Sequence, residues 1–389
     1  MIRSVIQHHK FNRILLLAVG LWPYHQSKFT RIQFIFLSVI LSASVIFQLT
    51  PLIILKCTSD LIIKVLSSVS FFMLFLIKYN SCHLNIEAVK YLFMELQDVF
   101  NNLKDENEIA IVEKYIYVTK RFTFVLTAFG VCGISASIIV EFWSIVDIPI
   151  NVSQSHHLFI MTKHFVDEKY FYLIMLYMYT ILCIVMTVML GTGTWLITYL
   201  QNICGMFKIA SHRIEHAVNN NISQNIMLKN KIFMNKGVIY AVDMHRQAIK
   251  LTENFMSTFE IMIFCFTLCV VICFSLNLFQ LFQIQLSKNN IKEFLLPLMY
   301  ATVSIIYMFV ANYMGQNIFD HNNHVFITAY NVRWYKTPVH IQKMILFLLQ
   351  RGTKKVTLNV GGIFEGTIEH FATLLKASIS YFTVIYSTQ

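Results

Sequence analysis

Seven long runs of apolar residues constrain this chain more than any other feature of its sequence. They lie near 32–55, 61–79, 122–146, 170–200, 259–286, 294–314 and 363–386. A helix needs about 20 mostly apolar residues to cross a bilayer, and each run approaches or exceeds that length. Over the whole chain 56% of the residues are apolar and 13% are charged, whereas a soluble domain carries about 25% charged residues. We therefore predict an all-α polytopic membrane protein with seven transmembrane helices.

The basic residues are concentrated in particular segments, and this predicts the orientation of the helices. Segments 1–31, 80–121, 201–258 and 315–362 hold 23 of the 31 lysines and arginines. Cytoplasmic loops of membrane proteins are enriched in these residues. The pattern therefore predicts a cytoplasmic N-terminus and, after seven crossings, an extracellular C-terminus. The net charge of +11 then reflects topology and contact with the anionic lipid bilayer, and not binding to nucleic acid.

The apolar runs and the charge pattern together divide the chain into six segments. They are a cytoplasmic N-terminal segment (1–31), helices 1–4 (32–200), a cytoplasmic helical extension (201–258), helices 5–6 (259–314), a cytoplasmic region with a short helix at 337–350 (315–362), and helix 7 with an extracellular tail (363–389). The short helix cannot span a bilayer, so we expect it to pack among helix ends. The triplet Asn151-Val152-Ser153 falls in a predicted outer loop, which makes Asn151 a candidate glycosylation site.

Two shorter segments outside the long runs are also predicted to be helical. Residues 14–21 are apolar and follow a basic start, which is typical of an amphipathic segment on the inner membrane surface or of a signal-peptide core. We favour the surface segment because the run is short, and we expect Trp22 at the level of the lipid headgroups. Between helices 2 and 3, apolar residues recur at helical spacing at Leu92, Leu96, Val99 and Leu103.

The sequence contains no motif that would support an enzyme or a bound cofactor. It has no phosphate-binding glycine loop, no nucleophile elbow and no metal-hydrolase motif. Cys265, Cys269 and Cys273 repeat every four residues, and a lipid-embedded apolar stripe is favoured there over a metal site. His321 and His324 share one helical face, but without further ligands we do not favour a metal pair. Gly191-Thr192-Gly193 is predicted to allow close helix packing.

The last predicted helix carries unusually many polar groups. Glu365, Glu369 and Lys376 fall within its apolar run, and ionisable groups at membrane depth are costly unless they face protein or water. The helix is therefore predicted either to border an aqueous path or to form a buried polar seam between helices, and we favour the path. Near its end Val384 is a candidate apolar constriction that would exclude water from such a path.

Aromatic residues gather in the predicted outer half of the helix bundle. The candidate pocket residues are Phe71, Phe72, Phe75, Phe142, Trp143, Tyr172, Tyr179, Tyr300 and Tyr307. A pocket with mainly aromatic walls and few hydroxyl groups suits a small volatile apolar ligand. An ordinary membrane aromatic belt with core packing is the alternative interpretation of the same residues.

Two groups of residues are similar to signatures of the insect odorant receptor family. One is Gly20-Leu21-Trp22-Pro23 near the N-terminus. The other lies in the last third of the chain and comprises Tyr330, Trp334-Tyr335, Pro338, the helix 341–350, Gly362-Ile363-Phe364, Phe371 and the stretch 376–383. The chain length, the seven predicted spans and the inside N-terminus also resemble this family.

The resemblance implies a subunit of an odorant-gated, non-selective cation channel. It implies a heterotetramer with a shared co-receptor, in the plasma membrane of a sensory neuron dendrite, with the seventh helix lining the pore. The family's gate follows a Tyr-Phe pair in this helix, which implies roles for Ser380, Tyr381, Val384 and Thr388 here. Because the co-receptor has a longer segment between helices 4 and 5, the chain resembles a ligand-tuning subunit. A gustatory-type receptor, a G-protein-coupled chemoreceptor and a transporter are the alternatives.

Overall fold

The protein is almost entirely helical. The computed structural model describes residues 10–54, 58–146, 171–222, 228–286, 291–352, 354–360, 362 and 364–387. Its helices are α2 (Lys10–Ala18), α3 (Lys28–Ile54), α4 (Ser59–Leu84), α5 (Ile86–Asn101), α6 (Glu106–Val146), α8 (Phe171–Ile222), α9 (Leu228–Leu286), α10 (Ile291–Asn331), the 3-10 turn η1 (Trp334–Lys336), α11 (Val339–Arg351) and α12 (Ile368–Ser387). The predicted all-α fold is confirmed.

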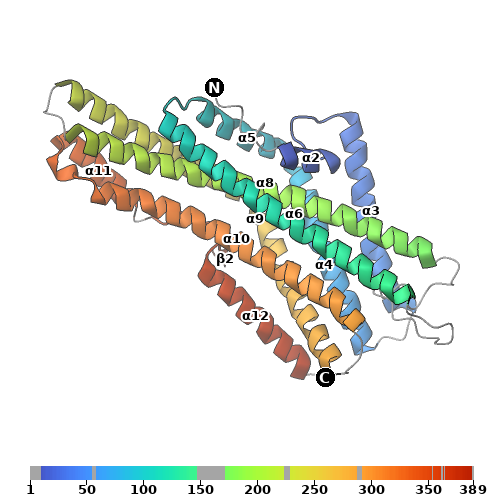
Figure 1. Ribbon diagram of the computed structural model, residues 1–389. Helices are drawn as coiled ribbons and strands as arrows, with labels where there is room; N and C mark the ends of the chain where they lie inside the picture. The colour runs from blue at the N-terminus through green and yellow to red at the C-terminus, as the bar shows by residue number, and fades with distance from the viewer. Residues whose placement is uncertain are drawn as a thin grey trace.

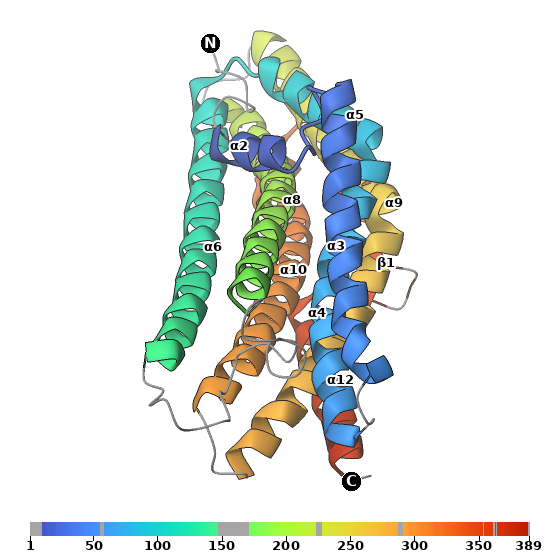
Figure 2. The same ribbon diagram turned by 90° about the vertical axis from the view of Figure 1, so that its right-hand side faces the viewer.

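The long helices lie side by side in one elongated bundle (Figure 1). In the described part of the chain, six helices are long and apolar enough to cross a membrane, namely α3, α4, α6, α8, α9 and α10. They contain the first six predicted runs. Helix α12, with 20 residues, occupies most of the seventh run and lies at the opposite end of the bundle from α2 (Figure 2).

Helices α8 and α9 extend well beyond the apolar runs that predicted them. They contain 52 and 59 residues, and at about 1.5 Å per residue each exceeds the roughly 30 Å hydrocarbon core of a bilayer. The extension of α8 keeps an apolar stripe at helical spacing, which is buried at Ile203, Phe207, Ala210, Ile214 and Ala217. The part of α8 beyond its apolar run can therefore remain helical, because it buries this stripe against neighbouring helices. Within the segment 201–258, α8 continues to Ile222 and α9 begins at Leu228, while the cytoplasmic position of this segment stays a prediction.

Glycines allow the backbones of α8 to approach its neighbours closely. A Cβ atom on Gly191 would lie 3.4 Å from the Cβ of Leu15 in α2, and one on Gly193 would lie 3.3 Å from the Tyr307 hydroxyl of α10. An added Cβ at Gly193 would be tight against Tyr307, whereas one at Gly191 would make an ordinary van der Waals contact. The predicted close packing at Gly191-Thr192-Gly193 is confirmed.

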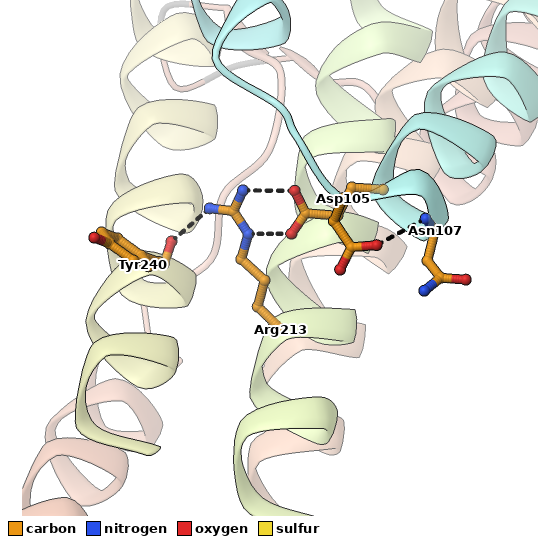
Figure 3. Close-up of polar contacts among 5 residues, drawn as sticks. Asp105, Asn107, Arg213 and Tyr240 are labelled. Atoms are coloured by element: carbon orange, nitrogen blue, oxygen red, sulfur yellow. Dashed lines mark hydrogen bonds and ion pairs between the residues drawn. The ribbon is translucent and has the colours of Figure 1, made fainter. Parts of the chain in front are cut away.

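An ion pair ties the extension of α8 to two neighbouring helices. The guanidinium of Arg213 in α8 donates to both carboxylate oxygens of Glu108 in α6, and its Nη1 donates to the Tyr240 carbonyl of α9 at 3.0 Å. Figure 3 shows this arrangement beside Asp105, whose carboxylate accepts from the Asn107 amide at 2.8 Å. Two parallel hydrogen bonds fix the orientation of the guanidinium as well as its position. One arginine thus connects three long helices.

The N-terminal segment enters the protein interior. The helix predicted near 14–21 is α2, which lies across the bundle in Figure 2. Trp22 follows it with only 7% of its surface exposed, and its ring lies 6.2 Å from that of Phe93. The chain turns at Gly20, where φ is +72°, and the ring packs on α5; the expected position of Trp22 at the level of the lipid headgroups stays a prediction. The helix predicted around Leu92 and Leu96 is α5, and both residues are buried.

The last helix begins later than its apolar run suggests. Glu365, predicted in helix 7, lies in a two-residue strand β2 (Phe364–Glu365) that pairs antiparallel with β1 (Asn359–Val360). After this hairpin Gly366 packs directly on Gly315 of α10, where an added Cβ would collide with the Gly366 carbonyl oxygen. This close backbone contact sets where α12 starts. The short helix predicted at 337–350 is confirmed as α11.

Candidate ligand cavity and pore-lining helix

A cavity of about 190 Å³ lies inside the bundle, between α4, α6, α8, α9 and α10. Most of its wall is apolar, with Phe129 from α6, Met189 from α8 and Ile263 from α9 among the lining residues. One end is closed by the β1–β2 hairpin, through Val360 and Phe364. A partly open, mainly apolar space with few polar groups is typical of a small-molecule site.

Helix α12 also contributes to this cavity. His370 and Leu374, which lie in its first two turns, line the wall together with Gly366 just before the helix. Leu374 is also one of the two α12 residues that are buried in the chain. An occupant of the cavity would therefore contact the bundle and α12 at the same time.

The cavity contains one ammonium group. Lys78 of α4 is 4% exposed, and its Nζ atom lies 4.8 Å from the ring centroid of Tyr307 and 5.7 Å from that of Phe266. The Tyr307 hydroxyl donates to the Met189 carbonyl at 3.2 Å. Gly193 leaves room for both groups, since its added Cβ would lie 3.4 Å from Nζ. The charged atom is thus held between aromatic faces and the α8 backbone.

Four of the predicted pocket residues form a dense aromatic cluster. Phe71 and Tyr300 stack with ring centroids 3.9 Å apart, and Phe75 meets Phe71 edge-on at 4.9 Å. Phe72 lies 6.1 Å from both other phenylalanines. All four are buried, and they pack against one another beside the cavity instead of lining it.

The other predicted pocket residues are distributed differently. Tyr307 lines the cavity, whereas Tyr179 donates to the Ser137 carbonyl of α6 at 3.1 Å. The side chains of Phe142, Trp143 and Tyr172 lie outside the described residues, as do Asn151 and Thr388. The composition of the ligand pocket therefore stays a prediction for these positions.

Sequence reasoning did not select Lys78, Gly193 or Leu374 as site residues. For Lys78 a signal was present, because a lysine inside an apolar run must be compensated by its surroundings. For Leu374 no signal was present, because leucine is the expected residue in any membrane helix. Only the folded chain shows that it faces the cavity.

The two faces of α12 have different surroundings. One face packs on α9, where the Ser275 hydroxyl donates to the Ser378 carbonyl at 3.0 Å and the rings of Phe282 and Phe382 are 4.8 Å apart. On the other face Tyr381 is 59% exposed and Val384 is 56% exposed. This second face is thus left open by the chain itself.

The polar residues predicted in helix 7 follow the open face. Glu369, Lys376 and Ser380 are exposed, and positions 376, 380 and 384 follow one another at four-residue spacing along it. The structure therefore does not bury these groups in a seam within one subunit. They face lipid, water or another chain.

The candidate metal positions have other partners. The Tyr115 hydroxyl and the Nε2 atom of His321 are 2.6 Å apart, and His324 lies 3.2 Å from the Ser211 hydroxyl. The thiol of Cys269 donates to the Ser70 carbonyl at 3.3 Å. Across the described ranges no three His, Cys, Asp or Glu side chains are grouped as a metal site would require.

Comparisons with known proteins agree on one kind of receptor. A family model described as 7tm Odorant receptor matches residues 58–379. Odorant receptor 10 of Aedes albopictus is 25% identical over 27% of this chain and 28% of its own length. Odorant receptor 30a of Drosophila melanogaster is 32% identical over 21% of each chain. These alignments thus span less than a third of either relative.

Among solved structures, the insect olfactory receptor OR5 from Machilis hrabei has a similar fold. In its complex with eugenol it superimposes with a TM-score of 0.77, covering 99% of this chain and 100% of that one at 12% identity. Its structure determined as the receptor alone gives a TM-score of 0.75. At this identity the likeness concerns the fold.

Proposed function

The chain belongs to the 7tm odorant receptor family, and from this premise we propose that it is the ligand-tuning subunit of an odorant-gated, non-selective cation channel. It assembles with a co-receptor as a heterotetramer in the plasma membrane of sensory neuron dendrites. Its ligand is a small, mainly apolar volatile molecule. Its family and its structural neighbours are receptors and channels, and not enzymes.

The observation that carries this proposal is the position of the cavity against α12. Helices α4, α6, α8, α9 and α10 form most of the wall, while His370 and Leu374 of α12 complete it. A ligand in this space can change the position of α12 only if it binds one conformation more tightly than another. Because the ligand would contact both the bundle and α12, a movement of α12 would change these contacts and thereby the affinity for the ligand.

The open face of α12 supports a role in lining a pore. Lys376, Ser380 and Val384 lie along this face and are exposed in the single chain. When α12 helices from several subunits surround one axis, the face is directed at that axis. Val384 then supplies an apolar ring that excludes water in the closed state, with Tyr381 beside it and Thr388 one turn later.

Exposed apolar residues on α11 support assembly with other subunits. Leu346 is 66% exposed and Phe347 is 70% exposed, although α11 lies in a segment predicted to be cytoplasmic. Large exposed apolar groups outside the membrane mark interaction surfaces. We therefore place a contact with the neighbouring subunit on α11.

The test is to express the chain with and without a co-receptor in cells that lack odorant receptors. We expect a panel of volatiles to evoke a cation current only when both chains are present. The current should persist when G-protein signalling is blocked, since the pore belongs to the receptor. When a tag is placed at either terminus of the receptor, only the C-terminal tag should be accessible on intact cells. A current abolished by the block, or an accessible N-terminal tag, would favour a G-protein-coupled receptor.

A further inference from the structure

Lys78 combines deep burial with unsatisfied hydrogen-bonding capacity. Its side chain lines the cavity and is 4% exposed. Throughout the part of the chain that the structure describes, its ammonium has aromatic faces as neighbours, Tyr307 at 4.8 Å and Phe266 at 5.7 Å, and no carboxylate or carbonyl oxygen at hydrogen-bond distance. Its three N–H donors therefore have no oxygen acceptor at hydrogen-bond distance among the described residues, although Glu365 also belongs to the mainly apolar wall.

The aromatic faces satisfy this ammonium only in part. A cation above a ring is attracted to it, but the loss of hydration on burial is larger, and buried charges are normally paired or hydrogen-bonded. By contrast, Lys64 on the same helix is partly exposed and forms an ion pair with Asp60 at 2.8 Å. Two lysines of α4 thus differ in whether the protein supplies a partner.

The hydroxyl donors around the cavity are already occupied, whereas the Nε2 atom of His370, which also belongs to the wall, has no hydrogen-bond partner among the described residues. The hydroxyl of Thr194 donates to the Leu190 carbonyl, and that of Thr267 donates to the Ile263 carbonyl at 2.8 Å. The Tyr307 hydroxyl donates to the Met189 carbonyl. The protons of these hydroxyl groups are therefore committed to backbone carbonyls. The Lys78 ammonium is the cationic donor that the cavity offers to an occupant.

We infer that this cavity selects small, mainly apolar molecules that carry a carbonyl or carboxylate oxygen, and that Lys78 donates a hydrogen bond to that oxygen. The inference rests on the proposed function and specifies the ligand class of its site. The apolar wall binds the carbon skeleton, while Lys78 fixes the end that carries the oxygen. A hydrocarbon of the same shape would leave the ammonium without an acceptor, which is the arrangement that discriminates strongly in buried sites.

The experiment compares matched molecules on the receptor expressed with its co-receptor. The probes are octane, 2-octanone and octanoic acid, together with ethylbenzene and acetophenone. The variants are Lys78→Met, which removes the donor, Lys78→Arg, which retains one, and the control Lys64→Met on the same helix. Binding is also measured, without reference to gating, as the shift in unfolding temperature of the purified receptor complex.

We expect the oxygen-bearing probes to act at lower concentrations than the hydrocarbons. Lys78→Met should raise their half-effective concentration about tenfold or more, as the loss of a charged hydrogen bond predicts. Responses to hydrocarbons should stay the same or improve. Lys78→Arg should recover most of the response, and Lys64→Met should match the wild type. If Lys78→Met weakens the response to the ketones alone or to the acid alone, the inference is still supported, and the result shows whether Lys78 donates to a carbonyl or to a carboxylate oxygen.

Three results would overturn the inference. One is an equal loss for hydrocarbons and oxygen-bearing probes in Lys78→Met, which indicates a purely structural lysine. Another is a wild type that does not prefer the oxygen-bearing probes. The third is the absence of both a current and a temperature shift with any of them. If Lys78→Met does not fold, Lys78→Leu, which also lacks a donor, is compared in the same way. A shift without any current upholds the inference and contradicts the proposed channel.

Discussion

Helices α8 and α12 both come from long apolar runs of the sequence, yet they are packed very differently in the folded chain. The middle of α8 is covered on several sides, and Val188, Met206 and Phe207 are fully buried. Of the 20 residues of α12, Leu374 and Ser378 are buried, while Tyr381 and Val384 remain more than half exposed. Helix α8 is therefore covered by other parts of the same subunit. Helix α12 has a face that the subunit itself does not cover.

Because of this difference in packing, we expect α8 to determine the stability of the fold and α12 to determine channel gating. A helix that is packed on all sides contributes to the free energy of unfolding and can move little. A helix held along one face can change its position with fewer lost contacts. The cavity lies where the two meet, with Met189 and Leu190 of α8 on one wall and Leu374 of α12 on another. We expect substitutions to affect folding at α8 and current at α12.

The largest effect is expected in the core of α8. Phe207→Ala should lower the free energy of unfolding by about 3–5 kcal/mol, because it leaves a cavity at a fully buried aromatic site. The receptor should be largely lost from the cell surface, as measured by surface labelling and by thermal unfolding in detergent. Phe309→Ala, at a ring that is 44% exposed, is the control. Equal surface levels for both variants would show that burial in α8 does not decide stability.

A somewhat smaller effect is expected where α12 begins. In Gly315→Ala the added methyl group would collide with the Gly366 carbonyl, and overpacking of this kind costs about 1–3 kcal/mol. Because α10 and the start of α12 must separate, we expect a reduced odorant-evoked current with the receptor still at the surface. Gly133→Ala, at a position with open space around it, should respond as the wild type does. A normal current in Gly315→Ala would show that this contact does not position α12.

A third substitution tests the open face of α12. Val384→Ala should change the free energy of unfolding by less than about 1 kcal/mol, because the side chain is 56% exposed. Its effect should appear as a higher basal current in cells that also express the co-receptor, since a smaller apolar ring excludes water less well. Ile379→Ala, at an exposed position off the predicted pore stripe, is the control. An unchanged basal current and ion selectivity would remove Val384 from the gate.

The smallest effect is expected away from both regions, at Glu95 of α5. Burial alone would raise the pKa of Glu95, but hydrogen bonds from Lys250, Tyr91 and Asn254, together with the charge of Lys250 2.7 Å away, outweigh it and hold this pKa below its ordinary value. Its stabilisation is therefore present above the ordinary glutamate pKa and is lost as the pH falls through the lowered one. Since Lys250 is 60% exposed, Glu95→Gln should cost less than about 1 kcal/mol at neutral pH. Thermal unfolding at pH 7 and pH 4 checks this, because the difference between variant and wild type should narrow at the lower pH.

The sequence allowed correct predictions for properties that depend on residues close together along the chain. The length of an apolar run predicts a helix that can span a bilayer, and a short run such as 337–350 predicts a helix that cannot. The same local reasoning failed at Glu365, which lies in strand β2, so that α12 begins later than hydropathy suggests, after the contact between Gly315 and Gly366. It also could not show that Trp22 packs against Phe93, a residue more than 70 positions away in α5.

By itself, the sequence determined the helical class, the approximate positions of the spans and the family resemblance, because apolar length and short motifs are local properties. The tertiary structure alone decided which face of α12 stays open, which phenylalanines pack together beside Tyr300, and that Lys78, Met189 and Leu374 share one cavity. These are contacts between residues far apart in the chain. They depend on how the helices rotate and cross, and no single helix encodes that arrangement.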